Sequence, residues 1–232
     1  MTEGAQFSSK ESRKPVEPLY LFLGALWIVW CLRATWLYSL DLNFAEGRFR
    51  NAYSNLVKFL IWVVPAALYY WLDGQRDLLK SFYLKRRPQR LLPVTALCLA
   101  YLGGILLSGL TLEHKSWLGP ASLLDASSRL AAVAVSPISE ELLFRGFVLP
   151  SFCQRISFWK SNLITALLFS SMHWPFWLWH NGPSMAVVQS SVTVFVIGLF
   201  LGWIWRISGS IWPPVAMHIA NNYLASFLVF RM

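Results

Sequence analysis

Two adjacent carboxylates and a guanidinium one helical turn later, Glu140, Glu141 and Arg145, lie in the otherwise apolar stretch SPISEELLFRG at 136–146. An ionised side chain inside a bilayer costs roughly 2.5–3.5 kcal/mol on insertion scales, so these groups must form pairs, face water or take part in chemistry. Glu141 and Arg145 are four residues apart and can pair along one helix face, which leaves Glu140 as the freer carboxylate. A carboxylate in a poorly solvated site is suited to act as a general base. The alternative is a buried Glu–Arg clamp that fixes helix packing without catalysis.

Two histidines follow in later apolar stretches, and His173 is the first of them. It lies in LLFSSMHWPFW, with Phe169 one turn before it and Pro175 two residues after it. Proline lacks an N–H and its ring clashes with an upstream carbonyl, so we expect the helix to loosen near His173. A histidine inside a membrane usually faces the interior of the helix bundle. His173 is therefore either a functional residue or a hydrogen-bonded core residue, whereas His180 is interpreted as interfacial.

The second histidine, His218, lies in PPVAMHIANNYL, and Asn222 follows it by four residues. Residues at this spacing share one helix face. An imidazole and a carboxamide can each donate a hydrogen bond, so the pair could hold the oxygen of a tetrahedral intermediate. A His–Asn turn occurs in many proteins, so this pair gains meaning only in combination with the other two stretches.

The composition indicates a polytopic membrane protein that must position these groups on helices. Hydrophobic residues make up 56% of the 232 residues and charged residues 13%, whereas soluble domains carry about 25% charged residues. A helix needs about 20 apolar residues to cross a bilayer. We therefore predict an all-α transmembrane bundle forming a single membrane domain over 1–232. We predict about seven spans, within a range of six to eight, at approximately 19–40, 56–72, 91–112, 127–150, 162–180, 184–206 and 211–230.

The distribution of basic residues orients this bundle. If the N-terminus is cytoplasmic, twelve basic residues lie on the inner side: Lys10, Arg13, Lys14, Arg76, Lys80, Lys85, Arg86, Arg87, Arg90, Arg155, Lys160 and Arg206. Four lie on the outer side: Arg48, Arg50, Lys115 and Arg231. Cytoplasmic loops carry the excess of Lys and Arg, so we predict the N-terminus inside and the C-terminus outside. Glu140, His173 and His218 then all fall in the inner half of the bilayer.

Three short motifs in a fixed order carry a resemblance to a known family. EELLFR at 140–145, F-x-x-x-H at 169–173 and H-x-x-x-N at 218–222 lie on three separate apolar stretches. This set resembles the CPBP family, the CAAX-protease and bacteriocin-processing membrane proteins, which are regarded as glutamic-type intramembrane proteases. The resemblance covers residues 127–226 as a CPBP-like catalytic core. Residues 1–126 contain N-terminal spans without a matching motif.

The resemblance implies hydrolysis of a peptide bond without a covalent intermediate. It implies that Glu140 with His173 activates a water molecule, and that His218 with Asn222 stabilises the oxyanion. Glu141 and Arg145 would orient the site or the substrate, and Phe169 belongs to the second motif as a supporting residue.

The expected cofactor is none. Glu140, His173 and His218 would be the ligands if the enzyme depended on zinc, but the sequence has no H-E-x-x-H helix, and we expect no metal. The net charge of +9 does not indicate a nucleic-acid partner, because the basic residues lie mostly between the apolar spans. The expected partners are the lipid bilayer and a membrane-embedded or lipidated protein or peptide.

The predicted function is an intramembrane endopeptidase that cuts its substrate near the C-terminus. The substrate could be prenylated, a C-terminal sorting tail or a peptide precursor, and the short loops favour a multi-pass protein of the bacterial inner membrane. The alternatives are a non-catalytic membrane scaffold or immunity protein on the same fold, or an ion- or proton-coupled transporter. The transporter is disfavoured because the sequence shows no repeated halves.

Overall fold

The computed structural model describes residues 17–42, 48–72, 87–111, 115–117 and 123–230. The fold is all-α apart from two three-residue strands in these ranges. The elements in chain order are α1 (Glu17–Ala34), a 3-10 turn η1 (Trp36–Tyr38), α2 (Ser39–Leu42), α3 (Arg48–Leu72), α5 (Leu91–Thr111), β1 (Lys115–Trp117), α6 (Leu123–Leu143), a π-helical turn η2 (Phe144–Val148), α7 (Leu149–Cys153), α8 (Phe158–Ser171), α9 (Trp174–Asn181), α10 (Met185–Ser208), α11 (Trp212–Phe227) and β2 (Leu228–Phe230).

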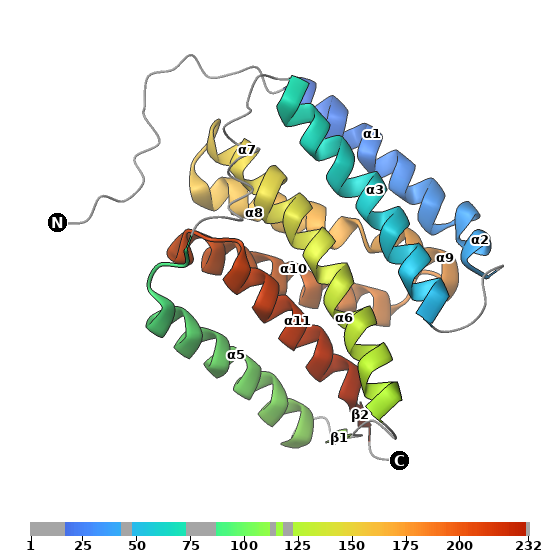
Figure 1. Cartoon of the computed structure of the whole chain (residues 1–232), viewed down its shortest axis with the longest axis vertical. Coiled ribbons are helices and arrows are strands. Elements are labelled where there is room, and N and C mark those ends of the chain that lie inside the picture. Colours follow the sequence, from blue (N-terminus) through green and yellow to red (C-terminus); the bar gives the residue numbers. More distant parts are fainter. Residues whose placement is uncertain (1–16, 43–47, 73–86, 112–114, 118–122, 231–232) are drawn as a thin grey trace.

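The continuous segment α6–η2–α7 is the most buried part of the described chain. Between Ser139 and Phe152 every residue except Leu142 is buried. This segment packs against α3 on one side and α11 on the other, with α8 and α10 behind it (Figure 1). The candidate residues of α6 therefore lie in the middle of the bundle.

Among the described residues, four helices are long and apolar enough to cross a membrane, over Glu17–Ala34, Arg50–Leu72, Leu91–Gly109 and Met185–Ser208. The three helices that carry the candidate residues are absent from this group for simple reasons. α8 and α11 have 14 and 16 residues, and α6 contains charged residues in its 21. The protein is an integral membrane protein, and the predicted bundle of about seven spans agrees with these helices.

Two of the predicted spans differ in detail from the observed helices. The span predicted at 162–180 is interrupted, because α8 ends at Ser171 and α9 begins at Trp174. The expected loosening near His173 is thus observed, since Pro175 occupies the first turn of α9, where a missing N–H is tolerated. The span predicted at 211–230 ends as a helix at Phe227, and residues 228–230 form β2.

Contacts between chain ends show which helix termini share a side of the bundle. The backbone N–H of Gln89 donates to the carbonyl of Ser208 at 2.7 Å. At the opposite end β1 pairs antiparallel with β2, with Lys115 opposite Phe230. Residues 89 and 208 therefore lie at one end of the bundle, and residues 115 and 230 lie at the other end. The count of basic residues assigned these residues to the same two groups.

Helices α8 and α10 approach each other closely because α10 carries glycines at the contact. A Cβ atom on Gly202 would lie 1.8 Å from Oδ1 of Asn162, and one on Gly198 would lie 3.2 Å from the ring of Phe169. The Asn162 amide donates from Nδ2 to the carbonyl of Leu199 at 2.9 Å. Small residues and interhelical hydrogen bonds are the usual means of helix packing in membranes.

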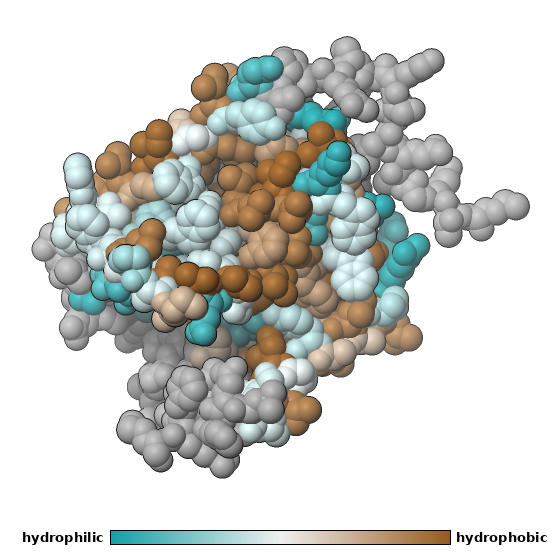
Figure 2. Space-filling model, turned by 180° about the vertical axis from the view of Figure 1, so that it is seen from behind, coloured by the Kyte–Doolittle hydropathy of each residue, from teal (hydrophilic) through white to brown (hydrophobic). Residues whose placement is uncertain are grey.

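The outer surface of the bundle suits contact with lipid. Apolar and aromatic residues cover much of the face seen from behind (Figure 2). Helix α10 alone exposes Met185, Val188, Val192 and Val196, each by half or more. Exposing so large an apolar surface to water would be unfavourable, whereas contact with the acyl chains of a bilayer carries no such penalty.

Candidate active site

Glu141 is fully buried and receives two hydrogen bonds on a single carboxylate oxygen. Nη1 of Arg145 donates to Oε1 of Glu141 at 2.8 Å, and Nδ1 of His218 lies 2.8 Å from the same oxygen. The ion pair predicted from the four-residue spacing is therefore present. A carboxylate paired with a guanidinium accepts hydrogen bonds, so Nδ1 of His218 carries a hydrogen. Nε2 of His218 then accepts a hydrogen bond when the ring is neutral and donates one when the ring is protonated.

Arg145 also links α6 to α10. Its Nη2 donates to the carbonyl of Gly198 at 2.7 Å, and the side chain is fully buried. Arg145 lies in the π-helical turn, five residues before Pro150. Proline cannot donate to a carbonyl four residues earlier, which is compatible with the wider turn observed at this position. Such π turns are frequent at functional sites.

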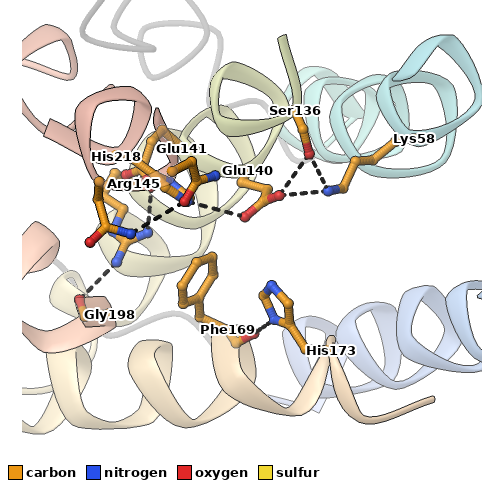
Figure 3. A network of polar contacts seen from close by, with 11 residues as sticks. Lys58, Ser136, Glu140, Glu141, Arg145, Phe169, His173, Gly198 and His218 are labelled. Carbon is orange, nitrogen blue, oxygen red and sulfur yellow. Dashed lines mark hydrogen bonds and ion pairs between the residues drawn. The ribbon is translucent and has the colours of Figure 1, made fainter. Parts of the chain in front are cut away.

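Glu140 is held by residues of α3 and α6. Nζ of Lys58 lies 2.6 Å from Oε1 of Glu140, and the hydroxyl of Ser136 donates to the same oxygen at 2.9 Å. The second oxygen, Oε2, lies 3.7 Å from Nε2 of His218. This last distance is too long for a direct hydrogen bond. Figure 3 shows the order of these polar groups, from Lys58 through Glu140 and His218 to Glu141 and Arg145.

The expectation that Glu140 is the freer carboxylate is wrong, because Lys58 forms an ion pair with it. Lys58 belongs to the stretch predicted to span the membrane at 56–72 and received no role from the sequence. A lysine near the start of the apolar stretch 56–72 was a usable signal, since a charged residue within a span needs a partner. The identity of that partner, 82 positions away, could not be read from local spacing.

His173 lies at the break between α8 and α9, across from Glu140. Its Nδ1 is 2.9 Å from the carbonyl of Phe169, and a carbonyl can only accept, so Nδ1 carries the hydrogen. In the neutral ring Nε2 therefore has a free lone pair. The ring points towards Glu140 and Lys58 in Figure 3, and the charges of both residues act on His173.

Phe169 is buried at the centre of the candidate site, where its ring contacts the guanidinium of Arg145 and both imidazole rings. Its ring centroid is 5.3 Å from that of His173 and 5.7 Å from that of His218, in edge-to-face geometry in both cases. The guanidinium carbon of Arg145 lies 5.0 Å from the same ring centroid. The ring thus fixes the spacing between the two histidines and supports Arg145 from one face.

Asn222 lies one turn beyond His218 on α11 and is half-buried. Its Oδ1 accepts a hydrogen bond from Nδ2 of Asn221 at 3.3 Å. The structure thus joins Arg145 and His218 to Glu141 by direct polar contacts and places Glu140 3.7 Å from His218. His173 faces this group across Phe169.

The described residues contain no group of three or more His, Cys, Asp or Glu side chains placed to hold a metal ion. Glu140 and His218 approach each other, but the ammonium of Lys58 is already bound to Oε1 of Glu140. A cation at 2.6 Å repels a divalent metal from the same oxygen.

Part of the chain is similar to a known protein family. Residues 121–224 match the family described as type II CAAX prenyl endopeptidase Rce1-like. Over these residues the chain is similar to the CPBP family. Searches of curated proteins and of solved structures gave no match. The matched stretch covers α6 to α11 almost completely, so it contains every candidate residue predicted from the three motifs. The match indicates a protease of the CAAX type and intramembrane endopeptidase activity in general.

Proposed function

We propose that this protein is a glutamic-type intramembrane endopeptidase in which Glu140 and His173 activate a water molecule. The proposal rests on the different surroundings of the two Glu140 oxygens. Oε1 is occupied by Lys58 and Ser136, whereas Oε2 faces Nε2 of His218 at 3.7 Å. A polar gap of this size suits a bridging water or a substrate oxygen.

The remaining groups can then be assigned to the steps of hydrolysis. The water oxygen attacks the scissile carbonyl carbon while one water proton passes to Glu140 Oε2 or to Nε2 of His173. The carbonyl oxygen becomes an oxyanion, which protonated His218 and the carboxamide of Asn222 stabilise by donating hydrogen bonds. The oxyanion then collapses and the C–N bond breaks, and the leaving nitrogen takes the same proton from Glu140 Oε2 or His173 Nε2, whichever group received it from the water.

Glu141 supports this assignment through His218. A carboxylate on Nδ1 fixes the orientation of the ring, as in Ser-His-Asp triads, so that Nε2 points towards Oε2 of Glu140. Arg145 and Phe169 hold Glu141 and the two histidines in place without contacting the reacting atoms. We assign the catalytic core to residues 127–226 within a single membrane domain over 1–232.

For the substrate, we propose a membrane-associated protein with a lipid-modified C-terminus. The matching family is named for CAAX prenyl endopeptidases, and a CAAX sequence is a prenylated cysteine followed by three residues. We also propose that the protein lies in a bacterial inner membrane with its N-terminus in the cytoplasm, which places the site near the inner leaflet. Sorting tails and peptide precursors are the competing substrate classes.

The decisive experiment compares purified wild type with Glu140→Gln in detergent, using a quenched peptide with a farnesylated cysteine followed by three residues. We expect Glu140→Gln to fold normally and to lose activity by about 100-fold or more, because a general base contributes 10²–10⁴. The matched control is Glu17→Gln, an identical change at an exposed position in the first turn of α1. Equal cleavage by wild type and Glu140→Gln contradicts the proposal. Ion uptake into liposomes that is lost in Glu140→Gln would favour transport instead.

A further inference from the structure

Two polar contacts enter the candidate site from helices that precede the family-matched stretch at 121–224. One comes from Lys58 on α3 and the other from Trp30 on α1. Sequence analysis found no motif in this part of the chain. These contacts therefore concern residues to which the family resemblance assigns no role.

Lys58 forms a closed triangle with two residues of α6. Its Nζ donates to Oγ of Ser136 at 2.7 Å and to Oε1 of Glu140 at 2.6 Å, and Ser136 donates to the same Glu140 oxygen at 2.9 Å. Because two donors satisfy Oε1, the carboxylate cannot rotate without breaking a charge-assisted hydrogen bond. Oε2 is thereby held towards His218.

Aromatic rings hold Lys58 in this position. Its Nζ lies 4.6 Å from the ring centroid of Trp62 and 5.8 Å from that of Trp30. The two indoles meet edge to face at 4.6 Å. The faces of aromatic rings attract an ammonium, so these contacts favour the observed conformation of the long lysine side chain.

Trp30 also reaches the other side of the site. Its Nε1 donates to the carbonyl of Met172 at 2.6 Å, and Met172 directly precedes His173 at the end of α8. Carbonyls at the end of a helix lack intrahelical partners, and this bond satisfies one of them. Trp30 therefore contacts both Lys58, which is bound to Glu140, and the backbone next to His173.

We infer that α1 and α3 complete the active site: Lys58 is a positioning residue for Glu140, and Trp30 is a positioning residue for His173. This inference rests on the proposed function. The ammonium orients the carboxylate through Oε1, so that Oε2 and Nε2 of His173 face the same reacting water. Neither Lys58 nor Trp30 contacts the substrate, so their loss should slow turnover without weakening binding.

The main test measures kcat and KM of Lys58→Met on the farnesylated peptide, with folded protein quantified by size-exclusion chromatography. We expect kcat to fall by about 10–100-fold with KM within about twofold, because the general base is misplaced but the substrate site is intact. Lys58→Arg keeps the cation and should recover most of kcat. Arg50→Met removes a basic residue from the same helix and should leave kcat unchanged. A wild-type kcat in folded Lys58→Met overturns the inference, and so does an Arg variant as slow as the Met variant.

Two uncharged changes keep the inference testable if Lys58→Met does not fold. Trp30→Phe removes the donor to Met172 and keeps a ring beside Lys58, and Ser136→Ala removes one donor to Glu140. We expect each to lower kcat by about threefold to tenfold, which is the loss of one hydrogen bond. Unchanged kcat in both variants overturns the inference.

A melting experiment separates this inference from the proposed function, because it requires no activity. The Tm of Lys58→Met should fall, since Glu140 is left as an unpaired buried carboxylate, and adding Glu140→Gln should restore part of the loss. Additive Tm changes overturn the contact itself. A wild type that cleaves no lipidated peptide overturns the proposed function and the catalytic part of this inference, whether or not the Tm changes are coupled.

Discussion

Glu140 and Glu141 are neighbours in the chain, yet each belongs to a different set of contacts. Adjacent residues on a helix point about 100° apart, so the pair serves two directions from one position. Glu141 faces Arg145 and Nδ1 of His218, while Glu140 faces Lys58 and Nε2 of His218. His218 thus lies between the two carboxylates, and each ring nitrogen has its own carboxylate. This arrangement orients the imidazole in the site without any local motif beyond two consecutive acids.

Arg145→Lys should destabilise the protein although it preserves the charge. The guanidinium bonds to Glu141 with one nitrogen and to Gly198 with another, whereas a single ammonium cannot reproduce both directions. We expect a loss of about 1.5–3 kcal/mol, the value of one hydrogen bond to a charged group, measured by denaturation in detergent. The control is Arg206→Lys, an exposed arginine at the last turn of α10. Similar losses in both variants would show that the contact with Gly198 contributes nothing.

Cleavage should be insensitive to chelators. Lys58 is bound to Oε1 of Glu140, and its positive charge repels a divalent cation from the same carboxylate. We expect incubation with EDTA or 1,10-phenanthroline, followed by gel filtration, to change kcat/KM by less than about twofold. A change of this size is no larger than the usual deviation of independent effects from additivity. Activity that disappears with the chelator and returns with zinc would assign Glu140, His173 and His218 as metal ligands instead.

Two prolines lie next to interruptions of regular α-helical hydrogen bonding, and each interruption contains a candidate residue. Pro150 follows the π-helical turn that contains Arg145, and Pro175 follows the break that contains His173. Both positions are readable from the sequence, because proline removes a backbone donor wherever it occurs. The break at His173 was predicted on this basis and is observed. The π turn was not predicted, since proline alone does not tell whether a helix kinks, stops or widens.

Gly202→Ala should loosen the contact between α8 and α10. The added Cβ would lie 1.8 Å from Oδ1 of Asn162, whose amide also donates to Leu199. Asn162 must move and lose this bond, so we expect a loss of about 1–3 kcal/mol, typical of overpacking, in the free energy of unfolding. Gly104→Ala on α5 is the matched control, because no atom lies within 4 Å of the added Cβ. It should be neutral or stabilise the helix by up to about 1 kcal/mol. Equal effects at both glycines would contradict close packing at Gly202.

Local features of the molecule could be predicted from the sequence, whereas contacts between distant helices could not. The Glu141–Arg145 pair follows from four-residue spacing, and the helical bundle follows from apolar length. The bond from Lys58 to Glu140 joins residues 82 positions apart, and that from Trp30 to Met172 joins residues 142 positions apart. Such contacts depend on which helix faces pack together, and apolar helices in lipid carry little periodic signal for their orientation. For this reason α1 and α3, which carry no family motif, could not be assigned to the site from the sequence.

The orientation of the whole bundle is the property that sets access to the site. Twelve basic residues against four predict a cytoplasmic N-terminus, and contacts between chain ends place residue 89 with 208 and residue 115 with 230 on opposite sides. Single cysteines at Gln89 and Thr111, which are exposed near the two ends of α5, test this in a chain whose native cysteines are replaced. A membrane-impermeant maleimide should label position 111 in intact cells, and position 89 only after the membrane is permeabilised. The reverse pattern would place Glu140 nearer the outer leaflet and redirect the search for substrates to the outer face of the membrane.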